Sequence, residues 1–172
     1  MAGSALGGRE PVDFLARFTA SEQFEKVFRE GMGLVEETAN YLDGPGRKDA
    51  RLLDRNGAIA YATESMRLTT RLMQLASWLL LQRAISAGEL SPEDACKEKH
   101  RISLTDIGAG HPLSGSDQLP ENLMQLVERS LHLHHRILKL DAMLAAKAKA
   151  GPQSESPVTE QLDRLARAYK AG

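Results

Sequence analysis

Cysteine is almost absent from this sequence: Cys96 is the only one among 172 residues, so no disulfide can form within the chain. The fold therefore does not depend on an oxidising compartment. An excess of charge of one sign is also absent, because 22 basic residues stand against 23 acidic ones and the formal net charge is −1. Nucleic-acid-binding domains usually gather a basic excess on one face. We therefore expect no nucleic-acid partner.

Long hydrophobic runs are missing as well. The most apolar stretch, Leu72–Leu81, is interrupted by Gln74 and Ser77, and it is about half the length of the roughly 20 residues that span a bilayer. The first ten residues are rich in Gly, Ala and Ser and lack the apolar segment of a signal peptide. We therefore expect no membrane insertion and a cytoplasmic protein.

Aromatic residues make up only 5% of the chain, whereas Leu, Ala, Glu, Arg and Met are plentiful, and this composition favours helices over sheets. Apolar residues recur at spacings of three and four from Phe24 to Leu42, which predicts a first helix. It should begin near Thr19–Ser21, where Thr19 and Glu22 have the spacing of a capping box. It should end at Asp43–Gly46, which contains two glycines and a proline.

A second, much longer helix is predicted from about Lys48 to Ala87, with a weak point at Asn56–Gly57. After it, Ser91–Asp94 has the order of an N-cap, a first-turn proline and an acidic first turn, which predicts a short helix. Residues 102–118 lose the helical pattern and contain several glycines, as loops do. A third long helix should then extend from Pro120 to about Ala150.

These elements predict an all-α fold. We expect an antiparallel up-down-up three-helix bundle over residues 19–150, with a short helix/loop connector before the third helix. Residues 1–18 should form a flexible arm, and residues 151–172, after a Gly-Pro break, a mobile tail. The tail carries a short amphipathic segment whose apolar side is a candidate contact for a partner: Val158, Leu162, Leu165 and Tyr169.

Three histidines lie close together on the third helix and invite comparison with a metal site. At about 100° per residue, His134 falls on the apolar side while His132 and His135 fall on the solvent side, so the imidazoles do not converge. Cys96 stands beside two lysines, but we interpret it as an ordinary thiol. The sequence therefore predicts no catalytic residue, no cofactor and no metal ligand.

Asp141 also falls on the apolar side of the third helix, where a carboxylate needs a partner. In an antiparallel bundle the end of the third helix lies near the start of the second, where Arg51 and Arg55 project to the apolar side. We therefore predict a structural ion pair between Asp141 and one of these arginines.

The second helix has more apolar surface than one neighbouring helix could cover. Two adjoining stripes account for it: Leu68, Leu72, Leu75 and Leu79 form one, and Met66, Met73, Ala76 and Leu80 form the other. Contiguous exposed apolar surface of more than a few hundred Å² is rare on monomers. We therefore predict a homodimer whose surface includes the four leucines of the first stripe.

The remaining strip of the second helix is polar and has the only tryptophan, Trp78, in its middle. An aromatic residue flanked by arginines and glutamines is typical of a protein contact. The candidate partner-binding residues are Arg67, Arg71, Gln74, Trp78, Gln82 and Ile85. The alternative is that the 88–118 connector or the N-terminal arm folds over the strip and buries it.

Two segments resemble a known family over long stretches. They are SEQFEKVFREGMGLVEETANYLDGPGR (Ser21–Arg47) and YATESMRLTTRLMQLASWLLLQRA (Tyr61–Ala84). They resemble the RcdA family, the regulators of CtrA degradation in alphaproteobacteria, and the likeness extends more loosely through the third helix to about residue 145. The arm and the tail after Ala150 carry no such resemblance.

The resemblance implies a three-helix bundle that can dimerise and has a poorly ordered C-terminal tail. It implies a non-enzymatic adaptor of the ClpXP protease in cell-cycle control, without a cofactor, in the cytoplasm and concentrated at a cell pole. A CpdR-like adaptor primes ClpX in that scheme, and the RcdA-like adaptor then delivers protein cargo. A PopA-like adaptor that binds cyclic di-GMP extends delivery to CtrA.

Two other classes of function stay open at the level of the sequence. One is a dimeric helical scaffold without a role in proteolysis. The other is a helical-bundle enzyme or metal protein, which the divergent histidines disfavour.

Overall fold

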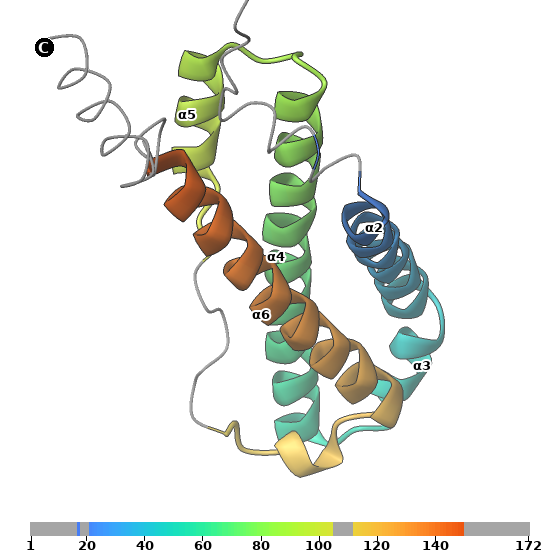
Figure 1. The fold of residues 1–172 in the computed structure, drawn as a ribbon. Helices are drawn as coiled ribbons and strands as arrows, with labels where there is room; N and C mark the ends of the chain where they lie inside the picture. The colour runs from blue at the N-terminus through green and yellow to red at the C-terminus, as the bar shows by residue number, and fades with distance from the viewer. Residues whose placement is uncertain (1–16, 18–20, 105–111, 150–172) are drawn as a thin grey trace, which may run out of the picture.

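The computed structural model describes residues 17, 21–104 and 112–149, and every regular element in these ranges is a helix (Figure 1). The all-α prediction is confirmed. Three long helices form the bundle: α2 (Glu22–Asp43), α4 (Arg55–Ser86) and α6 (Glu121–Lys149). Shorter elements connect them: α3 (Pro45–Arg51), α5 (Pro92–Arg101) and the 3-10 turn η1 (Ser116–Gln118). The predicted arm, except Arg17, and the predicted tail lie outside the described residues.

The helix starts follow the capping residues of the sequence. The Ser21 hydroxyl accepts a hydrogen bond from the Phe24 N–H at 3.3 Å and caps α2. The Ser91 hydroxyl accepts one from the Asp94 N–H at 3.1 Å and caps α5, as predicted from its proline and acidic first turn. The predicted capping-box residue Thr19 lies outside the described residues.

The predicted second helix is divided into α3 and α4, and the break lies at residues 52–54, just before the predicted weak point. The reason is Asp54, whose carboxylate accepts a hydrogen bond from the Gly57 N–H at 2.8 Å. An aspartate that caps the following turn begins a new helix instead of continuing the old one. The single helix from Lys48 to Ala87 was therefore a wrong prediction.

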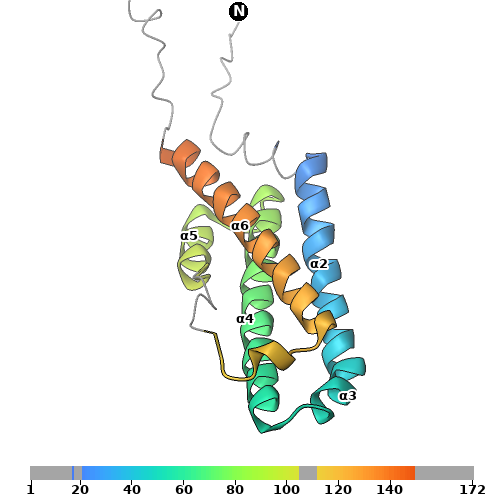
Figure 2. The same cartoon turned by 90° about the horizontal axis from the view of Figure 1, so that it is seen from below.

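The direction of the third long helix also differs from the prediction. Hydrogen bonds join Asp54 to Gln118, Arg71 to Ser130 and Trp78 to Asp141. The residue numbers therefore increase in the same direction along α4 and α6. These two helices therefore run the same way, and only α2 runs against them (Figures 1 and 2). The up-down-up order is wrong because Gln118 of η1 is bonded to Asp54 at the start of α4, so α6 begins at the same end of the bundle as α4.

The core lies where the three long helices meet, with α4 between α2 and α6. α2 and α4 approach closely at Gly31, where a Cβ atom would lie 2.6 Å from Leu79 Cδ1. The returning connector is fixed at Gly115, whose φ of 87° favours glycine and whose Cβ would meet the backbone of Asn56. The largest fully buried apolar side chains are Phe24, Leu34, Leu68, Leu75, Trp78, Leu79, Leu123, Leu133 and Ile137.

Candidate interaction surface

The predicted partner-binding strip of α4 faces the inside of the bundle. Trp78 and Arg71 are each 1% exposed, and Gln82 is 3% exposed. The guanidinium of Arg71 donates to the Ser130 hydroxyl at 2.8 Å, and that hydroxyl donates to the Val127 carbonyl. Gln74 and Ile85 are half-buried, and so is Arg67, which pairs with Glu64 at 2.7 Å. The alternative of a buried strip therefore holds for Arg71, Trp78 and Gln82. The partners of Arg71 and Trp78 come from α6 and not from the connector or the arm.

Asp141 binds partners other than the predicted ones. Its carboxylate accepts a hydrogen bond from the indole N–H of Trp78 at 2.9 Å and lies 3.3 Å from the Lys99 ammonium of α5. The prediction that Asp141 faces inward and is paired is confirmed, but the predicted partners Arg51 and Arg55 are wrong. Arg51 ends α3 and Arg55 begins α4, whereas Asp141 reaches Trp78 toward the other end of α4, because α6 runs parallel to α4.

The leucine stripe predicted as a dimer surface is also inside the chain. Leu68, Leu72, Leu75 and Leu79 are between 0% and 3% exposed and belong to the core that α2 and α6 share with α4. They are therefore not available to a second copy in this fold. The prediction assumed that one neighbour covers α4, whereas two helices do.

The exposed apolar surface of α4 is the adjoining stripe. Met66 is 71% exposed, Met73 65% and Leu80 53%, and Ile59 at 55% continues the row. These four residues are spaced seven apart, which places them in one line along a helix. The second apolar stripe predicted from the sequence already contains Met66, Met73 and Leu80, and Ile59 is the member of the row that it lacks.

A shallow apolar groove runs beside this row, between α2 and α4. Its volume is about 240 Å³. The lining side chains are all apolar or threonine: Val35, Thr38, Ala39 and Leu42 from α2, and Thr69, Leu72, Met73 and Ala76 from α4. Groove and row together make a continuous apolar feature on the described surface, and they resemble a site for a protein side chain more than one for a charged ligand.

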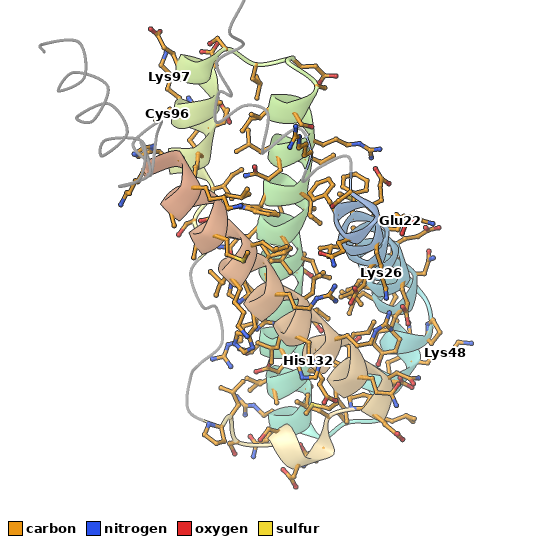
Figure 3. The ribbon with its side chains drawn as sticks, viewed as in Figure 1. Glu22, Lys26, Lys48, Cys96, Lys97 and His132 are labelled. Carbon is orange, nitrogen blue, oxygen red and sulfur yellow. The ribbon has the colours of Figure 1, made fainter. Side chains whose placement is uncertain are left out.

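The three histidines lie as the sequence predicted. His134 is fully buried, whereas His132 and His135 are exposed. Cys96 is exposed on α5, at the far end of the bundle from Lys48 of α3 (Figure 3). Within residues 17, 21–104 and 112–149, no group of three or more His, Cys, Asp or Glu residues could hold a metal ion.

Two tyrosines lie at the corner between α2, α3 and the start of α4. The Tyr41 hydroxyl donates to an Asp49 oxygen at 2.9 Å. Burial and this hydrogen bond raise the pKa of Tyr41 far above its usual range, and burial also raises the pKa of Tyr61. Both phenols stay neutral and act as hydrogen-bond groups that fix the corner.

None of the described helices is both long enough and apolar enough to cross a membrane.

Comparison with known proteins gives the family. Residues 15–169 match the protein-family model described as Protein of unknown function (DUF1465). No curated protein sequence matches the chain. Among solved structures, the crystal structure of RcdA from Caulobacter crescentus CB15 is similar, with 50% sequence identity and a TM-score of 0.59. The match covers 75% of this chain and 96% of that one, so the chain belongs to the RcdA family.

Proposed function

We propose that this protein is a non-enzymatic adaptor that delivers cell-cycle regulators to the ClpXP protease. The observation that carries the proposal is the 50% identity with RcdA over 96% of that chain. An exposed apolar row with a groove beside it, on the described surface, is consistent with a protein that acts by binding other proteins.

The proposed partners are ClpX primed by a CpdR-like adaptor, protein cargo, and a PopA-like adaptor for CtrA. An adaptor raises the local concentration of cargo at the protease, so its effect is on the rate at low cargo concentration. We also propose that the tail residues Val158, Leu162, Leu165 and Tyr169 contribute contacts to one of these partners. For this role we propose a cytoplasmic location, with the protein concentrated at a cell pole.

A reconstituted degradation assay tests the adaptor role. ClpXP, ATP, a CpdR-like adaptor and a labelled cargo regulator are mixed with and without this protein. We expect degradation to accelerate only when both this protein and the CpdR-like adaptor are present. An equal rate in all mixtures, with no binding of this protein to primed ClpX, would reject the adaptor role and favour the helical scaffold.

The contribution of the tail is tested in the same assay with a chain that ends at Gly151. We expect delivery to weaken while the melting temperature changes little, because the tail follows a Gly-Pro break and a polar linker. A large fall in melting temperature would instead place the tail in the core.

A metal protein is the second alternative, and elemental analysis of the purified chain tests it. We expect less than stoichiometric zinc, iron and copper. A stoichiometric transition metal would require a different function.

A further inference from the structure

One polar group in the groove between α2 and α4 has no hydrogen-bond partner. Thr38 and Leu72 are each 3% exposed and form the floor of the groove, whereas Met73 stands at its rim. The Thr38 hydroxyl makes no hydrogen bond with any residue that the structure describes. The Thr69 hydroxyl, by contrast, donates to the Ser65 carbonyl at 2.8 Å. A ligand with a hydroxyl group can therefore form a hydrogen bond with Thr38 that the fold itself does not supply.

The lining of the groove restricts the kind of ligand. No charged side chain is among the described residues that line it, so a charged ligand would lose its water without compensation. A cavity of roughly 150 Å³ holds a benzene ring, and the groove, at about 240 Å³, has room for one ring with a small substituent. The Met73 thioether favours contact with an aromatic ring. The groove therefore suits a neutral ring that carries one hydroxyl, which is the chemistry of a tyrosine side chain.

Tyrosine is scarce in this chain, which contains only three. Tyr41 donates to Asp49, and Tyr61 is half-buried at the same corner. Both are therefore held in place by the bundle. The third, Tyr169, belongs to the tail and follows Lys149, the last residue of α6, by twenty residues.

The length of chain before Tyr169 matches the distance to the groove. Asp141 is level with Trp78, so the end of α6 at Lys149 lies about 12 Å beyond that level along the bundle (Figure 2). The groove begins at Ala76, which lies about 160° around α4 from Trp78. The path along and around a helix about 11 Å wide is roughly 25 Å. Twenty residues of random chain have a root-mean-square span of about 25 Å.

We propose that the groove between α2 and α4 binds Tyr169 of the chain's own tail, with the phenol O–H donating a hydrogen bond to the Thr38 hydroxyl. A segment tethered at this length has an effective concentration on the order of millimolar. A single neutral ring binds a shallow groove with a dissociation constant that is also on the order of millimolar. The groove is therefore about half occupied, and a small change in affinity moves the tail between its bound and free states.

The contact would regulate the availability of the tail. This consequence rests on the proposed function at one point, namely that the tail residues also contact a partner. Tyr169 is withheld from that partner while it lies in the groove, and half occupancy weakens the apparent affinity of the partner about twofold. The contact itself depends only on the groove and Tyr169, and it holds whether or not the partner is ClpX.

Methionine methyl resonances test the contact in the full-length chain. With carbon-13-labelled methyl groups, Met73 reports on the groove, and Met124 of α6, which is 45% exposed, is the internal control. Tyr169→Ala should move the Met73 resonance, because the aromatic ring leaves the groove, and should not move Met124. The probe p-cresol, which is the tyrosine side chain as a free molecule, should then bind Tyr169→Ala and shift Met73. It should bind wild type about twofold more weakly, because Tyr169 competes with it.

Two matched variants in the Tyr169→Ala background test the hydrogen bond. Thr38→Val keeps the shape of the side chain and removes the hydroxyl, so it should weaken p-cresol about fivefold relative to toluene. Thr69→Val removes a hydroxyl that is already bonded to the Ser65 carbonyl, so the ratio of the two affinities should not change. Both variants should fold, because the Thr38 hydroxyl has no hydrogen bond to lose and Thr69 is exposed.

Four outcomes would overturn the proposal. Identical Met73 resonances in wild type and Tyr169→Ala would show that Tyr169 does not occupy the groove, even if p-cresol does. No response of Met73 to p-cresol would show that the groove does not bind a phenol. A difference that grows with protein concentration would assign the ring to a second copy. Equal effects of Thr38→Val and Thr69→Val would exclude the hydrogen bond. None of these measurements involves degradation, so the adaptor role is accepted or rejected separately, in the reconstituted assay.

Discussion

Two sides of α4 differ in a way that is opposite to the usual expectation, in which polar side chains face water and apolar side chains face the core. The side that faces α6 contains Arg71, Trp78 and Gln82 and is buried. The side that faces solvent contains Met66, Met73 and Leu80, each more than half exposed. Polar groups can be buried when their hydrogen bonds are made inside, as Arg71 does with Ser130 and Trp78 with Asp141. In a central helix, then, polarity alone does not tell which face meets water.

The largest expected effect is at Trp78. Trp78→Ala removes a fully buried indole and should lower the free energy of unfolding by about 3–5 kcal/mol, measured by urea denaturation. Trp78→Phe should cost less, because most of the volume stays. Since Trp78 is the only tryptophan, the wild-type emission should be blue-shifted. Near-native stability of Trp78→Ala would place the indole on the surface and would contradict the burial of this side of α4.

Two arginines on α4, one buried and one partly exposed, test whether burial decides the contribution of a charged side chain to stability. Arg71→Ala removes a buried guanidinium and takes a donor from Ser130, so it should cost about 2–3 kcal/mol of unfolding free energy. Arg67→Ala removes only a partly exposed pair with Glu64 and should cost about 0.5 kcal/mol or less. Equal costs in thermal or urea unfolding would show that burial does not separate these side chains.

A smaller effect is expected at Asp141. Asp141→Ala should cost about 1–2 kcal/mol, because the Trp78 indole loses its acceptor in a mostly buried place. Arg51→Ala and Arg55→Ala should each change stability by less than about 0.5 kcal/mol. If instead an arginine variant had the larger cost in the same unfolding assay, the parallel course of α4 and α6 would be wrong.

The start of α4 should give a small dependence of stability on pH. Hydrogen bonds from the Gly57 N–H and the Gln118 amide lower the pKa of Asp54. A lowered pKa in the folded state means that Asp54 stabilises the fold above its ordinary pKa of about 4, and that this contribution is lost as the pH falls through the lower folded value. Melting temperatures of wild type and Asp54→Asn should therefore differ at neutral pH and converge in acid. A constant difference would contradict this.

The smallest effect on stability is expected on the exposed side. Met66→Ser and Met73→Ser should each change the unfolding free energy by no more than about 0.5 kcal/mol, measured at concentrations that leave the chain monomeric. A cost above 2 kcal/mol in the dilute chain would mean that these side chains are buried within one copy.

Much of the helix inventory could be predicted, because it depends on local signals. Ser91, with the proline and the acidic first turn that follow it, predicts the start of α5. Pro120 predicts the start of α6 to within one residue. The apolar face of α2, from Phe24 to Leu34, follows from its spacing. The break before α4 was missed because an aspartate followed three residues later by a glycine is a weak cap signal inside a long helical pattern.

The candidate surface was predicted only in part. Helix projection found both apolar stripes of α4, but it assigned the exposed role to the leucines instead of to Met66, Met73 and Leu80. That choice needs the number and position of covering helices, which a projection of one helix does not contain. The direction of α6 could not be predicted for a similar reason. The connector that includes α5 is long enough for α6 to run either parallel or antiparallel to α4.

By itself, the sequence determined an all-α chain, the positions of most helix ends, the inward faces of α2 and α6, and membership of the RcdA family. These features follow from contacts between residues a few positions apart, or from identity with relatives. Only the tertiary structure decided that α6 runs parallel to α4, that Asp141 binds Trp78 and Lys99, and which stripe of α4 stays exposed. Such features depend on which helices pack against each other. The packing is driven by the burial of apolar surface between residues far apart in the sequence. Because the hydrophobic effect is non-directional, the spacing of residues within one helix does not identify the helix that packs against it.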